Sequence, residues 1–125
     1  MSTRIQNTSQ YLDELQDNMA QLIGCFYAVV FVEGEFKNTY NRAPSKALKK
    51  VVLEEGKGIA TETRKLIEDS TETNKVVEER LKNVPDDGKK HATEEHLKLR
   101  VRVLVNLEAY VVSLENQINE LKNEI

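Results

Sequence analysis

Apolar side chains recur every three or four positions through most of this chain, most regularly near its two ends. In the N-terminal third, two interleaved series of apolar residues each repeat every seven positions. The first series is Ile5, Leu12, Met19 and Phe26, and the second is Leu15, Leu22 and Val29. Two apolar positions in each heptad are typical of a coiled-coil seam. This pattern predicts a helix over residues 3–33.

The apolar stripe becomes wider towards the end of this first helix. Five further apolar or aromatic residues lie beside the seam: Tyr11, Ile23, Tyr27, Val30 and Phe31. A stripe of this width indicates burial against more than one neighbouring element. Gly34 is expected to end the helix, and the asparagines and the proline that follow it predict a loop over residues 34–44.

A second helix is predicted over residues 45–83, with Ser45 suited to cap its first turn. Apolar residues follow at helical spacing, but two features interrupt the pattern. Gly56 and Gly58 each cost about 1 kcal/mol relative to alanine inside a helix, and residues 68–75 are all polar. We therefore expect this helix either to break near the two glycines or to bulge into water between two buried patches.

A turn containing Pro85 should end the second helix, because proline lacks the amide hydrogen that a helix needs. Asp86 or Asp87 is then suited to cap a third helix, which the pattern predicts over residues 92–125. Its seam consists of two heptad series that only Arg100 interrupts. They are Leu97, Leu104, Val111, Ile118 and Ile125, and Leu107, Leu114 and Leu121.

Part of this third helix also fits a strand. Between Leu97 and Leu107, apolar residues alternate with mostly polar ones, which is the pattern of a half-buried strand. Leu104 breaks the alternation, and the heptad pattern continues through the segment on both sides. We therefore predict a helix here.

These patterns predict an all-α fold in which three long amphipathic helices form a helical bundle and coiled coil, as one domain over residues 1–125. The polar middle of the second helix makes it a poor third neighbour for the two seams. We therefore expect helices of another protein to complete the bundle, in an obligate hetero-oligomer. The predicted partner interface consists of Leu12, Leu15, Met19, Leu22, Phe26, Leu104, Leu107, Val111, Leu114, Ile118 and Leu121.

Composition supports long helices and excludes several classes of function. Charged residues make up 31% of the chain and apolar residues 39%, a balance that suits helices with one apolar side. With two prolines and five glycines, the chain is poor in the turns that a small sandwich or barrel requires. The net charge of −3 is too small and too mixed for an electrostatic nucleic-acid binder or a polybasic membrane patch.

The residues that usually carry catalysis or bind metal are few and badly spaced. His91 and His96 are five positions apart, so on a helix their side chains point about 140° apart. Zinc peptidase motifs place two histidines four positions apart. Cys25 is the only cysteine, which excludes an internal disulfide and suits a reducing compartment. We expect no enzymatic activity, metal or cofactor, and no membrane span, because the apolar run 22–32 is too short.

Several segments resemble a known family. Residues 11–22, followed by Phe26 and Tyr27, resemble the opening of the family of subunit 21 of the Mediator transcription complex. Three further segments resemble pieces of that family in the same order: 35–39, 77–85 and 93–97. Arg80 stands where the family is usually apolar, and residues 45–73 have no good counterpart.

The resemblance implies a nuclear coactivator subunit in the middle module of Mediator. It would pair with Mediator subunit 7 through a long coiled coil and support transcription by RNA polymerase II, without contacting nucleic acid directly. The alternative is a cytoplasmic protein of membrane trafficking, either a syntaxin-like N-terminal three-helix domain or another coiled-coil tethering subunit. A self-contained domain should bury its own stripes as a stable monomer, whereas an assembly subunit should leave an apolar seam open.

Overall fold

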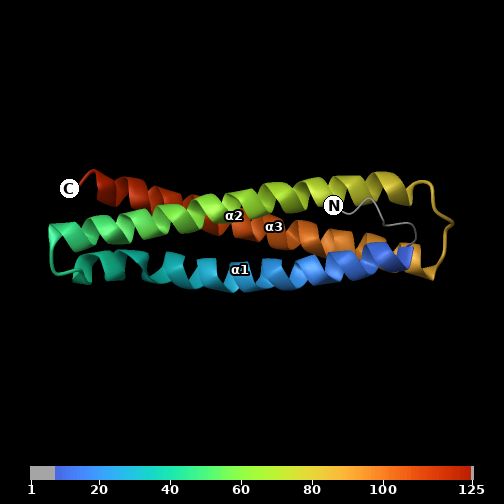
Figure 1. Cartoon of the computed structure of the whole chain (residues 1–125), viewed down its shortest axis with the longest axis horizontal. Coiled ribbons are helices and arrows are strands. Elements are labelled where there is room, and N and C mark those ends of the chain that lie inside the picture. Colours follow the sequence, from blue (N-terminus) through green and yellow to red (C-terminus); the bar gives the residue numbers. More distant parts are fainter. Residues whose placement is uncertain (1–7, 125) are drawn as a thin grey trace.

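Three long helices lie side by side in the computed structural model, which describes the backbone of residues 8–124 and the side chains of residues 12–124. They are α1 (Thr8–Arg42), α2 (Lys46–Leu81) and α3 (Gly88–Lys122). Neighbours along the chain run antiparallel, so the molecule is an elongated up-down-up bundle (Figure 1). The predicted all-α bundle is confirmed, while the predictions for residues 3–7 and for Ile125 lie outside the described residues.

Each helix contributes a row of side chains to a shared interior. The buried residues of α1 and α3 follow the predicted heptads, and all three pairs of helices are in contact. In α2 the repeat continues through small and polar residues, at Gly56, Thr63, Ser70 and Val77. Because all three rows face one axis, the chain forms a coiled coil with itself.

The first helix does not end at Gly34, so the predicted loop over residues 34–44 is wrong. Helix α1 continues to Arg42, and only residues 43–45 connect it to α2. Phe36 and Tyr40 extend the heptad beyond the glycine and are buried. Burying one such side chain contributes about 1.5–3 kcal/mol, which exceeds the cost of about 1 kcal/mol for a glycine inside a helix.

The second helix neither breaks nor bulges, which corrects both expectations for it. Gly56 is buried, and a Cβ atom at this position would lie 2.7 Å from Cζ of Phe36. The glycine therefore makes room for an aromatic ring of α1. In the polar stretch, Ser70 and Asn74 face the interior, so the helix stays in contact with its neighbours. The predicted cap at Ser45 is confirmed, because its hydroxyl accepts a hydrogen bond from the backbone amide of Leu48 at 3.2 Å.

The third helix begins at Gly88, four residues before its predicted start. Asp87 caps it, with Oδ1 accepting from the backbone amide of Lys90 at 2.8 Å. The segment from Leu97 to Leu107 is helical, as the heptad pattern predicted. The strand interpretation is therefore excluded.

Candidate helix-docking surface

The predicted interface residues lie within the chain's own bundle. Leu12 and Phe26 are half-buried, and the others are buried. Those others are Leu15, Met19, Leu22, Leu104, Leu107, Val111, Leu114, Ile118 and Leu121. The chain's own three helices cover both seams, so no partner helix is needed to keep them from water. A surface that receives a partner must therefore lie elsewhere, unless the bundle opens.

The outward side of α1 carries the most exposed large apolar side chains of the described residues. Tyr27 is 70% exposed and Phe31 is 71% exposed, one turn apart, and Ile23 lies one turn before them. Small residues lie between and beside these side chains, so the surrounding surface is also apolar. We call this surface the outer face, made of Ala20, Ile23, Gly24, Tyr27, Ala28, Phe31 and Gly34, all of them exposed.

The outer face lies within an uncharged stretch of α1. No Asp, Glu, Lys or Arg occurs between Asp17 and Glu33. A helix that contacts its own bundle on one side usually presents charged residues on the other. The width of the apolar stripe predicted a second neighbour for this helix, but the predicted partner interface was the seam and not the outer face.

Apolar surface continues from α1 onto the beginning of α2. Phe31 lines a shallow groove between the two helices, together with Val51, Val52 and Ile59. Val51 is itself exposed. A helix lying on the outer face would therefore have an apolar groove along one edge.

The groove between α2 and α3 has a different character. It has a volume of about 680 Å³ and lies near the loop that contains Pro85. Its lining combines apolar side chains with charges of both signs: Glu78, Lys82, Lys90, Glu94, Lys98 and Arg102. Such a lining is typical of a solvated boundary between helices.

A polar layer crosses the interior of the bundle at Arg100, the residue that interrupts the heptads of α3. Its side chain is 0% exposed. Nε donates a hydrogen bond to Oδ1 of Asn74 at 2.7 Å, one terminal nitrogen donates to Oδ1 of Asn18 at 2.8 Å, and the other to the carbonyl oxygen of Leu15 at 3.2 Å. The hydroxyl of Ser70 lies 3.4 Å from Oδ1 of Asn18 and donates to it.

These hydrogen bonds of Arg100 all go to uncharged oxygens. Burial disfavours the charged guanidinium, so the pKa of Arg100 is lowered from its ordinary value. The guanidinium can donate to the side-chain oxygens of Asn18 and Asn74 only if these two residues and Arg100 lie at one level of the bundle. The layer therefore favours one register of the three helices over any shifted one.

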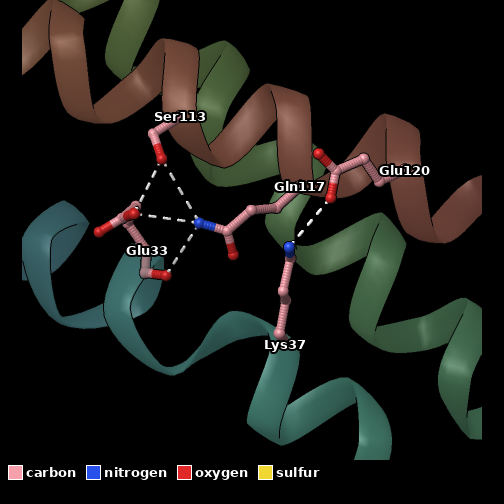
Figure 2. Close-up of polar contacts among 5 residues, drawn as sticks. All are labelled: Glu33, Lys37, Ser113, Gln117 and Glu120. Atoms are coloured by element: carbon pink, nitrogen blue, oxygen red, sulfur yellow. Dashed lines mark hydrogen bonds and ion pairs between the residues drawn. The ribbon is translucent and has the colours of Figure 1, made fainter.

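A second polar cluster joins the C-terminal half of α1 to α3, as Figure 2 shows. Oε1 of Glu33 accepts from the hydroxyl of Ser113 at 2.8 Å and from Nε2 of Gln117 at 3.0 Å. One turn further on, Nζ of Lys37 lies 2.9 Å from Oε2 of Glu120. Of these contacts, the one made by Lys37 anchors the part of α1 that was predicted to be a loop, and those of Glu33 hold the end of the predicted first helix.

The two histidines lie in the first turns of α3, and the cysteine lies in the middle of α1. His91 is exposed, whereas His96 is half-buried with a buried Nε2 that has no hydrogen-bond partner. Cys25 is half-buried, with its sulfur 3.6 Å from Oγ1 of Thr63. Among residues 12–124, no three His, Cys, Asp or Glu residues are grouped so that they could hold a metal ion.

Comparison with known proteins gives no relative from which a function can be transferred: no family model, curated protein or solved structure matches the chain.

One segment, Leu12–Arg42 of α1, is long and apolar enough to cross a membrane, as judged by length and composition alone. Core helices of bundles pass the same test, and α1 places Leu22 and Val29 in the interior of this one. The function must therefore be argued from the surface itself.

Proposed function

We propose that this chain is a non-enzymatic assembly subunit of a multiprotein complex. In this proposal it provides a preformed three-helix rod whose outer face on α1 receives a helix of another protein. The observation that carries the proposal is the exposure of Tyr27 and Phe31 within an uncharged part of α1. Contiguous exposed apolar surface of this kind marks interaction sites in soluble proteins.

The shape of the outer face supports a helix as the occupant. Tyr27 and Phe31 project from consecutive turns, and the neighbouring positions Ala20, Gly24 and Ala28 are small. Ridges of large side chains packing into the gaps left by small ones are the usual way in which two helices associate. Covering each aromatic side chain contributes about 1.5–3 kcal/mol before the costs of association.

The most specific form of the proposal is a nuclear subunit of the Mediator middle module, with Mediator subunit 7 as the helical partner. It rests on the sequence resemblance. Because the seams of α1 and α3 are filled by the chain's own helices, such a partner would bind the outer face, or would have to open the bundle to reach the seams.

A second candidate is a syntaxin-like N-terminal three-helix domain of membrane trafficking. The observation that favours it is the closed antiparallel bundle, in which the three helices bury their own stripes (Figure 1). The two candidates differ in the protein that should bind the outer face. One expects a transcription coactivator subunit, and the other a membrane-fusion or tethering protein.

Affinity purification from native extract tests the proposal. The wild-type chain is compared with a variant that carries Tyr27→Glu and Phe31→Glu, and the bound proteins are identified by mass spectrometry. The matched control is Val105→Glu, which changes a valine of α3 that is also exposed. We expect a complex with wild type and control that the double variant loses. Equal recovery of the same proteins with all three chains would refute docking on the outer face.

A further inference from the structure

We infer that the end of the bundle formed by the turn between α1 and α2 binds the surface of an anionic lipid bilayer. We call this end, residues 42–50, the basic end. The inference goes beyond the proposed function, because the basic end and the outer face are different surfaces. It starts from the uneven distribution of charge along the chain.

Basic residues are concentrated around this turn. Residues 36–53 contain five Lys and Arg residues and no Asp or Glu, although the whole chain has 21 acidic residues and only 18 basic ones. The net charge of −3, from which no polybasic patch was expected, is therefore an average over an uneven distribution. Clusters of this many basic residues are typical of segments that bind anionic lipid.

The fold places these basic residues at one end of the rod (Figure 1). Because α1 ends at Arg42 and α2 begins at Lys46, the turn brings both side chains to the same end. Arg42, Lys46 and Lys50 are exposed. Among the residues whose side chains are described, none forms an ion pair with any of these three. Their charges are therefore available to an external anion.

The fourth basic residue of this end also holds the turn in place. Lys49 is half-buried, and its Nζ donates a hydrogen bond to the carbonyl oxygen of Tyr40 at 2.8 Å. The same ammonium group lies 4.6 Å from the centre of the Tyr40 ring. Lys49 thus joins the last turn of α1 to the first turn of α2. The other three basic side chains project from a fixed base.

The charged residues beside the basic end do not cancel it. Lys37 and Glu120 form an ion pair with each other at 2.9 Å. Lys122 and Glu124, at the end of α3, are both exposed and carry opposite charges. These four residues therefore add little net charge at this end.

The nearest acids along α1 and α2 lie farther back along the rod. Glu35 precedes Arg42 by seven residues, and Glu54 follows Lys46 by eight. At the rise of a helix, these separations are about 10 Å and 12 Å. A surface that meets the rod at its end is therefore closer to the bases than to these acids. Screening at physiological salt, with a Debye length of about 8 Å, weakens the repulsion from the acids further.

Apolar side chains at the same end favour a lipid over an acidic protein. Pro44 is exposed, and Leu48 is 46% exposed between the lysines. Apolar groups beside basic ones are typical of segments that insert into the boundary between headgroups and acyl chains. The turn is the narrow end of the rod (Figure 1). A fluid layer of headgroups can surround such an end without a complementary groove.

The number of basic residues sets the expected strength of binding. Each Lys or Arg close to an anionic membrane strengthens binding about fivefold. The four basic residues of this end should therefore favour anionic over zwitterionic lipid by roughly several-hundred-fold. Because the charges are exposed, binding should weaken as the salt concentration rises.

Co-sedimentation of the purified full chain with lipid vesicles tests the inference. One set of vesicles contains equal parts of phosphatidylcholine and phosphatidylserine, and the other contains phosphatidylcholine alone. We expect the wild type to bind only the first set. A variant that carries Lys46→Glu and Lys50→Glu should bind at least tenfold more weakly. Equal binding of this variant and the wild type would refute the inference.

The matched control carries Lys65→Glu and Lys75→Glu. It makes the same change in net charge, at two exposed lysines farther along α2. We expect it to bind as the wild type does, because these lysines lie away from the basic end. An equal loss of binding in the control would show that net charge alone governs binding, and would refute a specific site. Circular dichroism on each variant verifies that the helices are retained.

A second variant tests the apolar contact. Leu48→Gln should weaken binding several-fold at low and at high salt, because it removes an inserted side chain without changing charge. Leu99→Gln, which changes an exposed leucine of α3, should leave binding unchanged. If both variants bind as tightly as the wild type, the turn does not insert into the bilayer.

Other outcomes separate this inference from the proposed function. A wild-type chain that binds polyglutamate but neither set of vesicles would identify an acidic protein segment as the partner, and would refute the inference. Vesicle binding that is lost with Tyr27→Glu and Phe31→Glu, but kept with Lys46→Glu and Lys50→Glu, would place the lipid contact on the outer face instead. In the absence of any vesicle binding, the proposed docking of a helix on the outer face still stands or falls by affinity purification.

Discussion

Asn74 is expected to stabilise the fold more than any other asparagine on α2 or α3, because it satisfies a buried cation. Its Oδ1 accepts a hydrogen bond of 2.7 Å from Nε of Arg100, whose side chain is 0% exposed. Replacing Asn74 by leucine removes the acceptor and leaves a buried N–H group without one. A hydrogen bond to a charged group contributes about 1.5–3 kcal/mol. We therefore expect Asn74→Leu to lower the free energy of unfolding by about 2–3 kcal/mol.

The assay is denaturation by urea, followed by circular dichroism at 222 nm, with Asn106→Leu as the matched control. Asn106 is exposed to solvent and lies well away from the ends of α3. Both substitutions therefore gain the same few tenths of a kcal/mol in helix propensity. Only the first changes the polar layer. Equal stability of the two variants would refute the reasoning, because the hydrogen bond to Arg100 would then contribute nothing.

The double variant Asn74→Leu with Arg100→Leu provides a further check. In the double variant, the guanidinium of Arg100, which has lost its acceptor on Asn74, is removed as well. Replacing both members of a buried polar pair by apolar side chains is often neutral or stabilising. The double variant should therefore be more stable than Asn74→Leu alone. A double-mutant cycle should give a favourable coupling of about 1.5–3 kcal/mol between the two residues.

Two further predictions concern packing and pH. Gly56→Ala should lower the free energy of unfolding by about 1–2 kcal/mol, because the new Cβ atom would crowd Phe36. Gly58→Ala should raise it by about 0.5–1 kcal/mol, because no atom lies within 4 Å of a Cβ atom at that position. The same urea assay distinguishes the two variants. The hydrogen-bonded ion pair with Arg64 lowers the pKa of Glu115. The pair therefore stabilises the fold at pH values above the ordinary pKa of a glutamate. This stabilisation is lost as the pH falls through the lowered pKa. Both side chains are about one-third exposed or more, so Glu115→Gln should cost less than about 1 kcal/mol near pH 7 and nothing at the acid end of a pH series of unfolding curves.

Much of the fold could be predicted from the heptads, and the errors have a common physical cause. The apolar repeats correctly located the interior positions of α1 and α3. In α2 the same repeat is carried by Gly56, Thr63 and Ser70, which composition alone assigns to a solvated surface. Their small size lets the other helices approach, so the third neighbour that was judged unsuitable for the seams in fact covers them.

The polar layer and the outer face could be predicted only in part. Arg100 stood out as an interruption of the heptads, but its acceptors come from other helices, and their level along the bundle depends on the relative positions of all three. The breadth of the apolar stripe around Tyr27 and Phe31 was visible in the sequence. Which part of that stripe is exposed to water depends on which side of α1 the helices α2 and α3 cover.

The location of Arg100 along the rod divides its apolar interior unequally. Among residues 12–124, whose side chains are described, a small cluster of Leu15, Val77, Leu81 and Leu97 lies on one side. The larger remainder of the described core lies on the other. Because a segment with fewer apolar contacts opens at a lower free energy than a longer one, the end near Pro85 should fray while the opposite end stays folded. Transient opening at that end would bring water to the guanidinium of Arg100. The polar layer should therefore limit how far local unfolding spreads along the bundle.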